Sequence, residues 1–592
     1  MIHRRGIVVD LSKKKIIHEK IEKRILDLFL GGNGIGAYML YEKMRTNNAF
    51  SPESWVICVP GVLNGSTFPM TSKCGFFGLS PLTKAFGESY FGSSLGVFLK
   101  SRKYDFISIT GRSDSLCYIL VDEGVSLVEC ENLRGVPTSE CEKILKAEYN
   151  GSCACIGPAG ENLVKFAAIV GEGRQAGRTG LGAVLGSKNL KGIVVVPGTV
   201  EYKDKEKIRK VRKKCVEGFL GGDGYPAYQG YRSFGTGKAI IPFSEKWGVL
   251  PTENFEKSQF DKASKIDSTA WIDDTKSTGC HGCMIACGKV YKGVSDPEFE
   301  TLYSLGSNLL CGDIEVIAEA NRLCDEYGID TISMGGVLGY VMSLSKEGII
   351  QEEIPFGDGD TILSLIEKTA FREGIGDTLA EGVRRVSEKY GNTYHAVHVL
   401  GLEPPAYDVR GMKGMALSFV TSPRGACHLR SSAYVVELAG AWQQFKTDRF
   451  SSHEKGYVAW MENLMALHDI LGTCKFTRDF YLPDIMSEML EAYTGIQKTP
   501  EELIGIGERT FNLEWLFNIR NGIKIGSLPP KFGVPIEKGP SKGYFISEKD
   551  EKKMKREYFK ARGWDEEGVP TKETLERLKL PSLCSYVRHH SI

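Results

Sequence analysis

Three cysteines in CHGCMIACGK, residues 280–289, have the spacing of a metal-binding loop. Cys280, Cys283 and Cys287 follow a C-x2-C-x3-C pattern, and thiolates so spaced bind iron–sulfur clusters or zinc. A cubane cluster takes four thiolate ligands, so one ligand must come from elsewhere. The third cysteine favours a cluster over zinc, for which C-x2-C is a common half-site. Radical enzymes that use S-adenosylmethionine carry the reverse order, and no parallel βα repeat surrounds the loop here.

Cys474 is a candidate for the missing ligand, although its spacing alone does not prove it. It ends the segment DILGTC, in which Gly472 suits the left-handed residue that closes a helix and begins a rigid turn. The segment DEYGID has the same pattern, D-x-x-G-x-(D/C), with Gly328 in the glycine position. Its last residue, Asp330, is expected to cap the next helix. On capping chemistry alone, coincidence explains this similarity equally well.

The other cysteines are expected to be mostly small buried residues. Cys153 and Cys155 are too close together for an ordinary chelating loop and lie in a strand-like run. The first residues, MIHRRGIVVDLSKKK, lack the apolar core of a secretory signal. With 16 cysteines and no such signal, the sequence predicts a reducing compartment, the cytoplasm, where clustered cysteines bind metals or act in catalysis.

Charge and hydropathy exclude two classes of protein. The 592 residues include 75 Lys and Arg against 74 Asp and Glu, so no net basic face is expected to bind nucleic acid. No run of about 18 apolar residues is present, so we expect no membrane-spanning helix.

The periodicity of apolar residues changes along the chain. Short β-branched runs predict strands within the first 200 residues. They are GIVVDL, SWVICVP, YDFISITG, LCYILVD and GIVVVPG. Helical spacing follows in DIEVIAEANRLCDEYG, DTISMGGVLGYVMSLSKEG, DTLAEGVRRVSEKYG and EKGYVAWMENLMALHDILG. The charged stretch 200–214 fits a domain junction or a solvated helix face, and GLEPPAYDVRG interrupts the helices near residue 400. We therefore predict an α+β protein with domains 1–203, 204–400 and 401–592.

Several long segments occur in a recognisable order. They are LGGNGIGAYML, LSPLTKAFGESYFGSSLG, IGPAGENLVKFAAIVGEGRQAGRTGLGAVLGSKNLKGIVV, PEFETLYSLGSN, EANRLCDEYGIDTIS, GLEPPAYDVRGMKGMALSFVTSPRGACHLR and RGWDEEGVPTKETLERLKL. Together with the cysteine loop and DILGTC, they resemble the tungsten-containing aldehyde:ferredoxin oxidoreductase family nearly from end to end. The glycine loops GGNGIGA and GRTGLGAVLG lack the G-x-G-x-x-G spacing, which argues against a Rossmann site.

The resemblance implies an architecture and a set of cofactors. The β-rich N-terminal domain would hold two sheets that form a base for the cofactor, below two mainly α-helical domains. The cofactor would be one tungsten held by the dithiolenes of two pyranopterins (tungstopterin), with a magnesium ion bridging its phosphates. A [4Fe–4S] cluster would lie beside one pterin, ligated by Cys280, Cys283, Cys287 and Cys474. Since the protein supplies no ligand to the tungsten, the sequence does not distinguish tungsten from molybdenum.

The same resemblance assigns the residues around the cofactor. Asp325 and Asp469 would each bind one pterin, because a carboxylate can accept two neighbouring N–H groups of its guanidine-like edge. The other cofactor-binding positions are Lys73, Tyr90, Gly92, Arg174, Gln175, Asp330 and Thr473. Lys73 and Tyr90 stand where well-studied members have Arg and Asn, which leaves the magnesium site open. Glu319 matches a ligand of an interfacial iron in some members, but no histidine lies between residues 281 and 395, so that iron is not expected.

Two residues match the family's active-site groups. Glu300 in PEFETL matches its carboxylate, and an apolar pocket would raise the pKa of Glu300 and suit it to general base work. His428 in GACHLR matches the family's active-site histidine. Such a histidine could donate a proton to the oxygen on which charge develops during the reaction. Without the resemblance to this family, Glu300 would be interpreted as a surface carboxylate and His428 as a core histidine.

The resemblance implies oxidation of a small aldehyde to a carboxylate, with water as the oxygen source and ferredoxin as the electron acceptor. An alternative is a low-potential reductase of the aryl-CoA reductase type, which works with an iron–sulfur partner subunit. A third possibility is an iron–sulfur electron-transfer protein without tungsten. The two pterin motifs and the glycine loops argue against the third.

Overall fold

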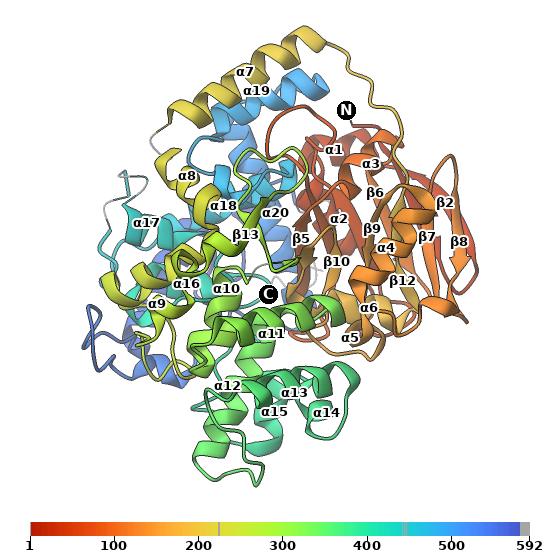
Figure 1. The fold of residues 1–592 in the computed structure, drawn as a ribbon. Coiled ribbons are helices and arrows are strands. Elements are labelled where there is room, and N and C mark those ends of the chain that lie inside the picture. The colour runs from red at the N-terminus through yellow and green to blue at the C-terminus, as the bar shows by residue number, and fades with distance from the viewer. Residues whose placement is uncertain are drawn as a thin grey trace.

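The computed structural model describes residues 2–580 except 223–224, 296, 441, 443 and 446. Figure 1 shows a β-rich N-terminal part packed against a larger helical body. The predicted α+β class, with two sheets followed by helices, is therefore confirmed. The domain boundaries after residues 203 and 400 stay predictions, although the first falls just before the long helix α7 (Lys205–Gly221).

The first sheet has six strands in the order β2-β1-β6-β3-β4-β5. Only β1 and β6 pair in parallel, and the other neighbours are antiparallel. Its strands are β1 (Arg5–Asp10), β2 (Lys15–Lys20), β3 (Val56–Pro60), β4 (Lys73–Leu79), β5 (Phe86–Gly92) and β6 (Phe106–Thr110). Helices α1 (Lys23–Phe29), α2 (Gly32–Lys43) and α3 (Leu95–Ser101) belong to the same part of the chain.

The second sheet also has six strands, in the order β11-β10-β9-β12-β7-β8. They are β7 (Cys117–Val121), β8 (Val125–Glu129), β9 (Ser152–Cys155), β10 (Ile169–Gly171), β11 (Arg174–Ala176) and β12 (Leu190–Val195). Helices α4 (Thr138–Tyr149), α5 (Pro158–Glu161) and α6 (Leu181–Ser187) accompany it. The edge strands β5 and β11 lie against each other, so the two sheets meet there. All five β-branched runs noted in the sequence form strands.

The helical body begins with α7, whose apolar face buries Ile208, Val211, Cys215 and Phe219 while its charged face is solvated. Its first half continues with α8 (Tyr225–Phe234), α9 (Ala263–Ile266), α10 (Phe299–Thr301), α11 (Ile314–Tyr327), α12 (Thr331–Lys346), α13 (Gly359–Phe371), α14 (Ile375–Leu379) and α15 (Val383–Tyr390). A small sheet of β13 (Thr275–Thr278), β14 (Gly288–Tyr291) and β15 (Val294–Ser295) frames the cysteine loop. One predicted helix is divided into α14 and α15, because Gly382 between them has a φ of 80°.

The second half of the body holds α16 (Lys413–Thr421), α17 (Ala433–Ala439), α18 (Tyr457–Leu471), α19 (Pro483–Thr494), α20 (Pro500–Arg520), α21 (Glu548–Arg562) and α22 (Lys572–Arg577). Helix α20 joins the two parts of the molecule. Its Phe517 packs into the core of the first sheet, and its Trp515 packs into the core of the body. The positions of side chains from distant segments are therefore fixed relative to the sheets.

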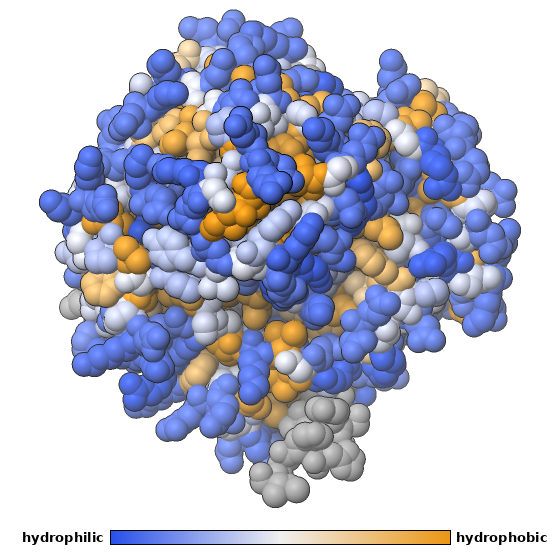
Figure 2. All heavy atoms as spheres, turned by 90° about the horizontal axis from the view of Figure 1, so that it is seen from below, coloured by the Kyte–Doolittle hydropathy of each residue, from blue (hydrophilic) through white to orange (hydrophobic). Residues whose placement is uncertain are grey.

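Hydrophilic side chains cover most of the face in Figure 2, and apolar residues show between them in separate strips. Among the helices that the structure describes, none combines the length and apolarity needed to cross a bilayer.

Candidate active site and cysteine cluster

The two D-x-x-G motifs form matching turns that bind to different sheets. Gly328 and Gly472 both adopt left-handed backbone conformations after α11 and α18, with φ angles of 71° and 79°. The carbonyl of Gly328 accepts a hydrogen bond from the N–H of Ala168 at 2.8 Å, just before β10. The carbonyl of Gly472 accepts one from the N–H of Lys73 at 3.0 Å, the first residue of β4. The similarity noted in the sequence is therefore structural, and each sheet of the base carries one copy.

Asp469 and Cys474 lie at the two ends of the second turn. The glycine is required there because a Cβ on Gly472 would lie 2.6 Å from the side chain of Asn64 and 2.7 Å from the backbone of Gly61. Such contacts allow the turn to lie directly on the base. The side chain of Thr473 is held within the turn, where its Oγ1 lies 2.6 Å from Nδ1 of His468.

The cysteine loop and Cys474 are joined through Met70. The N–H of Met70 donates to the carbonyl of Gly282 in the loop at 3.0 Å, and the carbonyl of Met70 accepts from the N–H of Cys474 at 2.9 Å. Cys280 reaches the edge of the first sheet, where a Cβ on Gly92 would lie 2.5 Å from its sulfur atom. The fold therefore brings Cys474 beside the loop.

The four thiols differ from the rest of the cysteines. Cys280, Cys283, Cys287 and Cys474 are partly exposed, whereas the other eleven cysteines that the structure describes are buried, as expected. Cys283, Cys287 and Cys474 pack around one apolar group that includes Phe219 of α7 and Tyr228 of α8. In the described part of the chain, no three His, Cys, Asp or Glu side chains converge on one point as ligands of a single ion.

Two cations lie beside the thiols. Burial lowers the pKa of Lys73, but the negative charges of Cys280 and Cys474 outweigh this effect and raise it. Arg174 on β11 forms an ion pair of 2.7 Å with Glu298, and one of its terminal nitrogens is buried without a partner. Both cations would offset the negative charge of a thiolate cluster.

Glu300 and His428 meet in a partly buried pair. Nε2 of His428 lies 3.5 Å from Oε1 of Glu300, and the side chains are only 14% and 20% exposed. Glu300 is in α10, and its Oε2 accepts a hydrogen bond of 2.8 Å from the N–H of Ala406. Burial raises the pKa of Glu300 to about 8. Burial, with Arg178 nearby, lowers the pKa of His428 well below its usual value, so the imidazole is neutral.

Aromatic and cationic side chains surround this pair. The ring of His428 stacks on Tyr407 with centroids 5.2 Å apart. Arg178 lies 3.0 Å from the carboxylate of Asp330 and donates to the carbonyl of Glu403 at 2.6 Å. Asp330 also caps α12 by accepting bonds from the N–H groups of Ile332 and Ser333, so its predicted capping role is confirmed. The carboxylate of Asp330 is thus fully engaged by the protein.

The two candidate pterin carboxylates have different surroundings. Asp325 accepts hydrogen bonds from the amide groups of Gln175 and Asn321, and burial raises its pKa to about 7. Asp469 instead lies 2.7 Å from the ammonium group of Lys475 and is buried. The first carboxylate therefore has neutral partners, and the second has a cation.

A buried ionic network supports the second turn, and sequence reasoning did not identify it. Arg430 forms ion pairs with Glu88 at 2.6 Å and Glu514 at 2.5 Å and lies 3.7 Å from Asp469. The hydroxyl of Tyr90 donates to Glu88, so this side chain is occupied within the network. The only signal in the sequence was local, since Arg430 is two residues after His428 and Lys475 directly follows Cys474.

Unpartnered polar atoms gather around these residues and test whether a polar cofactor fits. Those buried without a hydrogen bond in the described part of the chain include Glu300 Oε1, His428 Nδ1, Arg174 Nη2 and His468 Nε2. Unmet hydrogen bonds in a protein interior are costly and mark the place of an additional polar group. With four nearby thiols, this donor set fits a cofactor that offers pterin edges, anionic groups and a cluster.

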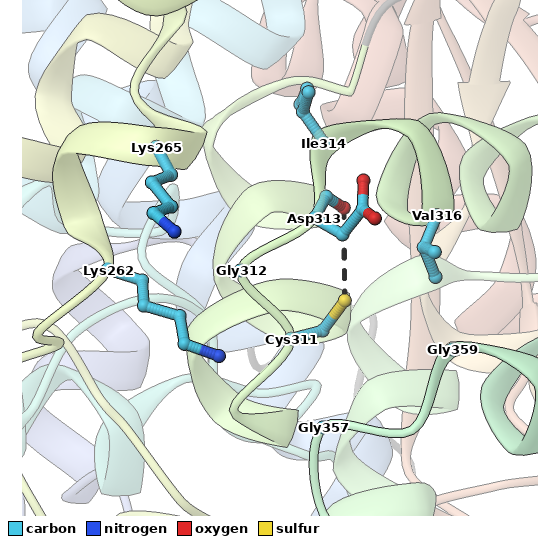
Figure 3. Close-up of a pocket in the computed structure, with 9 residues that line it drawn as sticks. All are labelled: Lys262, Lys265, Cys311, Gly312, Asp313, Ile314, Val316, Gly357 and Gly359. Atoms are coloured by element: carbon cyan, nitrogen blue, oxygen red, sulfur yellow. Dashed lines mark hydrogen bonds between the residues drawn. The ribbon is translucent and has the colours of Figure 1, made fainter.

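Two other features lie outside this site. Figure 3 shows a surface pocket of about 480 Å³ at the start of α11. Its Lys262 and Lys265 are exposed, and its carboxylate, Asp313, caps α11 by accepting a bond of 2.9 Å from the N–H of Glu315. Glu319 is occupied by Arg322, which donates to both of its oxygens at 2.8 and 2.6 Å.

Family models match nearly the whole chain. The model of the N-terminal domain of aldehyde ferredoxin oxidoreductase matches residues 6–197, and the model of its domains 2 and 3 matches residues 223–580. The chain belongs to the aldehyde ferredoxin oxidoreductase family. The expectation of an oxidoreductase of this type is thereby confirmed.

Individual relatives are similar to this chain over nearly its whole length. It is 36% identical to the tungsten-containing aldehyde ferredoxin oxidoreductase of Pyrococcus furiosus over 97% of its own length and 98% of the relative's. The identity is 35% to the enzyme of the same name from Thermococcus kodakarensis, with the same coverage. The WOR-like subunit of aliphatic sulfonate oxidoreductase from P. furiosus is 28% identical over 96% of each chain.

A solved structure shares the fold of this family member. A chain of the BamBC active-site complex of benzoyl coenzyme A reductase superposes with a TM-score of 0.83 at 23% identity, covering 98% of this chain and 97% of that chain. At this identity, the likeness concerns the fold alone.

Proposed function

We propose that this protein oxidises aldehydes to carboxylates with water as the oxygen source and passes the electrons through a [4Fe–4S] cluster to ferredoxin. The observation that carries the proposal is the Glu300–His428 pair, a carboxyl group of raised pKa beside a neutral imidazole. In the overall reaction, the aldehyde gains one oxygen from water, two electrons leave, and three protons are released when the product acid ionises.

The chain offers a place for each part of a tungstopterin cofactor. Asp325 and Asp469 would each accept hydrogen bonds from one pterin, and Cys280, Cys283, Cys287 and Cys474 would hold the cluster. Arg174 and the backbone around Gly92 and Gln175 would bind the cofactor's phosphates, next to Lys73. When bound, the tungsten centre supplies a two-electron acceptor, and the cluster supplies a one-electron relay. Magnesium between the phosphates and the choice of tungsten over molybdenum belong to the same proposal.

Glu300 and His428 would divide the proton transfers. Ionised Glu300 can take a proton from the attacking water, because its Oε1 accepts no hydrogen bond in the described part of the chain. With the proton on Nδ1, His428 can donate to the aldehyde oxygen while its Nε2 faces Glu300. Groups of opposite role within 3.5 Å of each other can also exchange the proton directly.

The route for electrons follows the second turn. Asp469 and Cys474 lie on the same turn, so a pterin bound at Asp469 would lie next to a cluster ligand. His281 and Gly282 at the tip of the cysteine loop are exposed, so a soluble electron carrier can approach the cluster there. The proposed partner is ferredoxin or an iron–sulfur electron-transfer subunit.

The alternative is a reductase subunit that works with an iron–sulfur partner subunit. It is supported by the fold shared with the benzoyl coenzyme A reductase complex, at the level of the fold only. A single experiment separates the two functions. Anaerobically purified protein is analysed for tungsten, molybdenum and iron, then assayed with short and aromatic aldehydes and a viologen dye, and with aryl-CoA thioesters and a low-potential donor. Aldehyde-dependent dye reduction supports the proposal, whereas thioester reduction alone would refute it.

A further inference from the structure

Arg478 is a buried cation that forms no ion pair in the described part of the chain, although the charge of Asp479, the next residue, helps to raise its pKa. Its side chain follows the short helix Lys475–Thr477 and is only 6% exposed. One terminal nitrogen donates to the carbonyl of Lys475 at 2.8 Å, and its Nε has no partner in the described part of the chain. No carboxylate among the described residues lies within 4.0 Å of its guanidinium group.

Several cations around the site are ion-paired, and Arg424 and Lys73, which are not, have the sulfur of Cys427 and the thiols of Cys280 and Cys474 beside them. Arg174, Arg178, Arg430 and Lys475 each lie within 3.0 Å of a carboxylate oxygen. A buried charge is stable only when it is paired or hydrogen-bonded, because its loss of hydration is large. The Nε of Arg478 is therefore free to donate to a further anion.

The position of Arg478 relates it to the Glu300–His428 pair. Its guanidinium carbon lies 5.7 Å from the ring centroid of Tyr434. That ring lies 6.3 Å from the ring of His428 and 4.8 Å from the ring of Tyr407. The cation and the histidine thus both lie beside Tyr434, and the charge of Arg478 is among those that lower the pKa of His428, so Arg478 belongs to the surroundings of the reacting pair.

We propose that Arg478 binds an anionic group of the substrate, so that the aldehydes oxidised best carry a carboxylate a few bonds from the reacting carbonyl. This inference rests on the proposed function and adds the substrate class. Arginine suits the role because its planar guanidinium can donate two parallel hydrogen bonds to a carboxylate. Tyr434, over which the guanidinium lies, would form one wall of this subsite.

The same chemistry could come from the cofactor, whose phosphates and thiolates are also anionic. The two sources predict different losses when Arg478 is changed. An arginine that binds the cofactor is needed for tungsten content and for every substrate, whereas one that binds the substrate is needed only for anionic aldehydes.

The test compares ω-oxocarboxylates of increasing length with uncharged aldehydes of equal length, using a viologen acceptor and enzyme of measured tungsten and iron content. Wild-type protein is expected to show a higher kcat/KM for at least one ω-oxocarboxylate than for its uncharged counterpart. Arg478→Gln should lower kcat/KM about 10- to 100-fold for that anion, which corresponds to the loss of one charged hydrogen bond. For the uncharged aldehyde, kcat/KM of the variant should stay within about threefold of the wild-type value. Arg478→Lys should restore part of the loss.

The control is Arg322→Gln, which removes a partly exposed arginine from α11 and should leave kcat/KM for both classes of aldehyde unchanged. Equal losses for charged and uncharged aldehydes, or a loss of tungsten in Arg478→Gln, would assign the residue to the cofactor and overturn the proposal. The absence of any preference for anions in the wild-type enzyme would overturn it as well. Failure of the proposed function looks different, because then neither class of aldehyde is oxidised.

Discussion

The backbone N–H of Cys474 donates a hydrogen bond of 2.9 Å to the carbonyl of Met70. Met70 in turn donates to Gly282, between Cys280 and Cys283, so one residue of the base fixes the distance between the cysteine loop and the second turn. The fourth thiol is therefore held in place by the backbone of the N-terminal part. This connection gives the cluster assignment a sharp test.

Replacing Cys474 by alanine should lower the iron content and remove the paramagnetic signal of the reduced cluster. The physical reason is that a cubane left with three thiolates has one iron without a protein ligand. Iron analysis and electron paramagnetic resonance measure both effects. The control is Cys311→Ala, which removes a thiol that is 2% exposed and lies outside the site. Full iron with an unchanged spectrum in Cys474→Ala would show that the fourth ligand lies elsewhere.

Gly472→Ala should destabilise the protein more than Gly495→Ala does. Both glycines have nearly the same left-handed conformation, with φ of 79° and 78°, so both substitutions carry a similar backbone strain of about 1–2 kcal/mol. A Cβ at residue 495 would meet nothing within 4 Å, whereas at 472 it would press on Asn64 and Gly61. The midpoint of thermal unfolding and the iron content measure the difference. Equal effects would mean that the close approach of the turn to the base is unimportant.

Glu300→Gln should keep the metals and lose about 10²–10⁴-fold in turnover, the usual contribution of a general base. Because the ionised carboxylate is the active form and its pKa is about 8, the wild-type rate should rise with pH through that value. The variant should lack this rise. His428→Phe should show a smaller loss at equal cofactor content. The measurement is turnover at saturating aldehyde across a range of pH. A Glu300→Gln enzyme with near wild-type rates would exclude Glu300 as the base.

The same carboxyl group should make stability depend on pH. The pKa of Glu300 is about 8 in the folded protein but about 4.3 in the unfolded chain. Its stabilising contribution is therefore complete below about pH 4.3 and is lost as pH rises to 8, because the unfolded chain ionises first. The difference in thermal midpoint, Glu300→Gln minus wild type, should therefore increase as the pH is raised from 5 to 9. Glu319→Gln, at an exposed carboxylate whose pKa is lowered by Arg322, should show no such gain.

Asp325→Asn and Asp469→Asn should each weaken cofactor binding. Each variant leaves one pterin edge without its carboxylate, at a cost of about 1–3 kcal/mol or more when charges are involved. Asp469→Asn should have the larger effect on stability, since it also leaves Lys475 without its ion pair. Tungsten and pterin content of purified protein measure the first effect. Asp313→Asn, which alters only the cap of α11, is the control. Wild-type cofactor occupancy in both variants would refute the two assignments.

The sequence by itself determined the local features. Alternating and helical spacing of apolar residues depends on neighbours in the chain, so the strands of the first 200 residues, α11, α12 and α18 could be predicted. The glycines of both D-x-x-G turns could be predicted for the same reason, because only the local backbone decides a left-handed residue. The order of the motifs was sufficient to indicate the family. The helix divided at Gly382 shows the limit of periodicity, since one glycine with positive φ ends a pattern that otherwise continues.

Only the tertiary structure decided which distant residues meet. Glu300 lies in α10 and His428 in the loop between α16 and α17, and the distance between them follows from how these segments pack. Arg430 joins Glu88, Glu514 and the Asp469 turn across three parts of the chain, and no spacing in the sequence records such a network. That Arg478 forms no ion pair among the described residues became visible only when the surrounding carboxylates had been placed. A buried charge depends on what surrounds it in three dimensions, because its partners and its loss of water are set by packing and not by its neighbours in the chain.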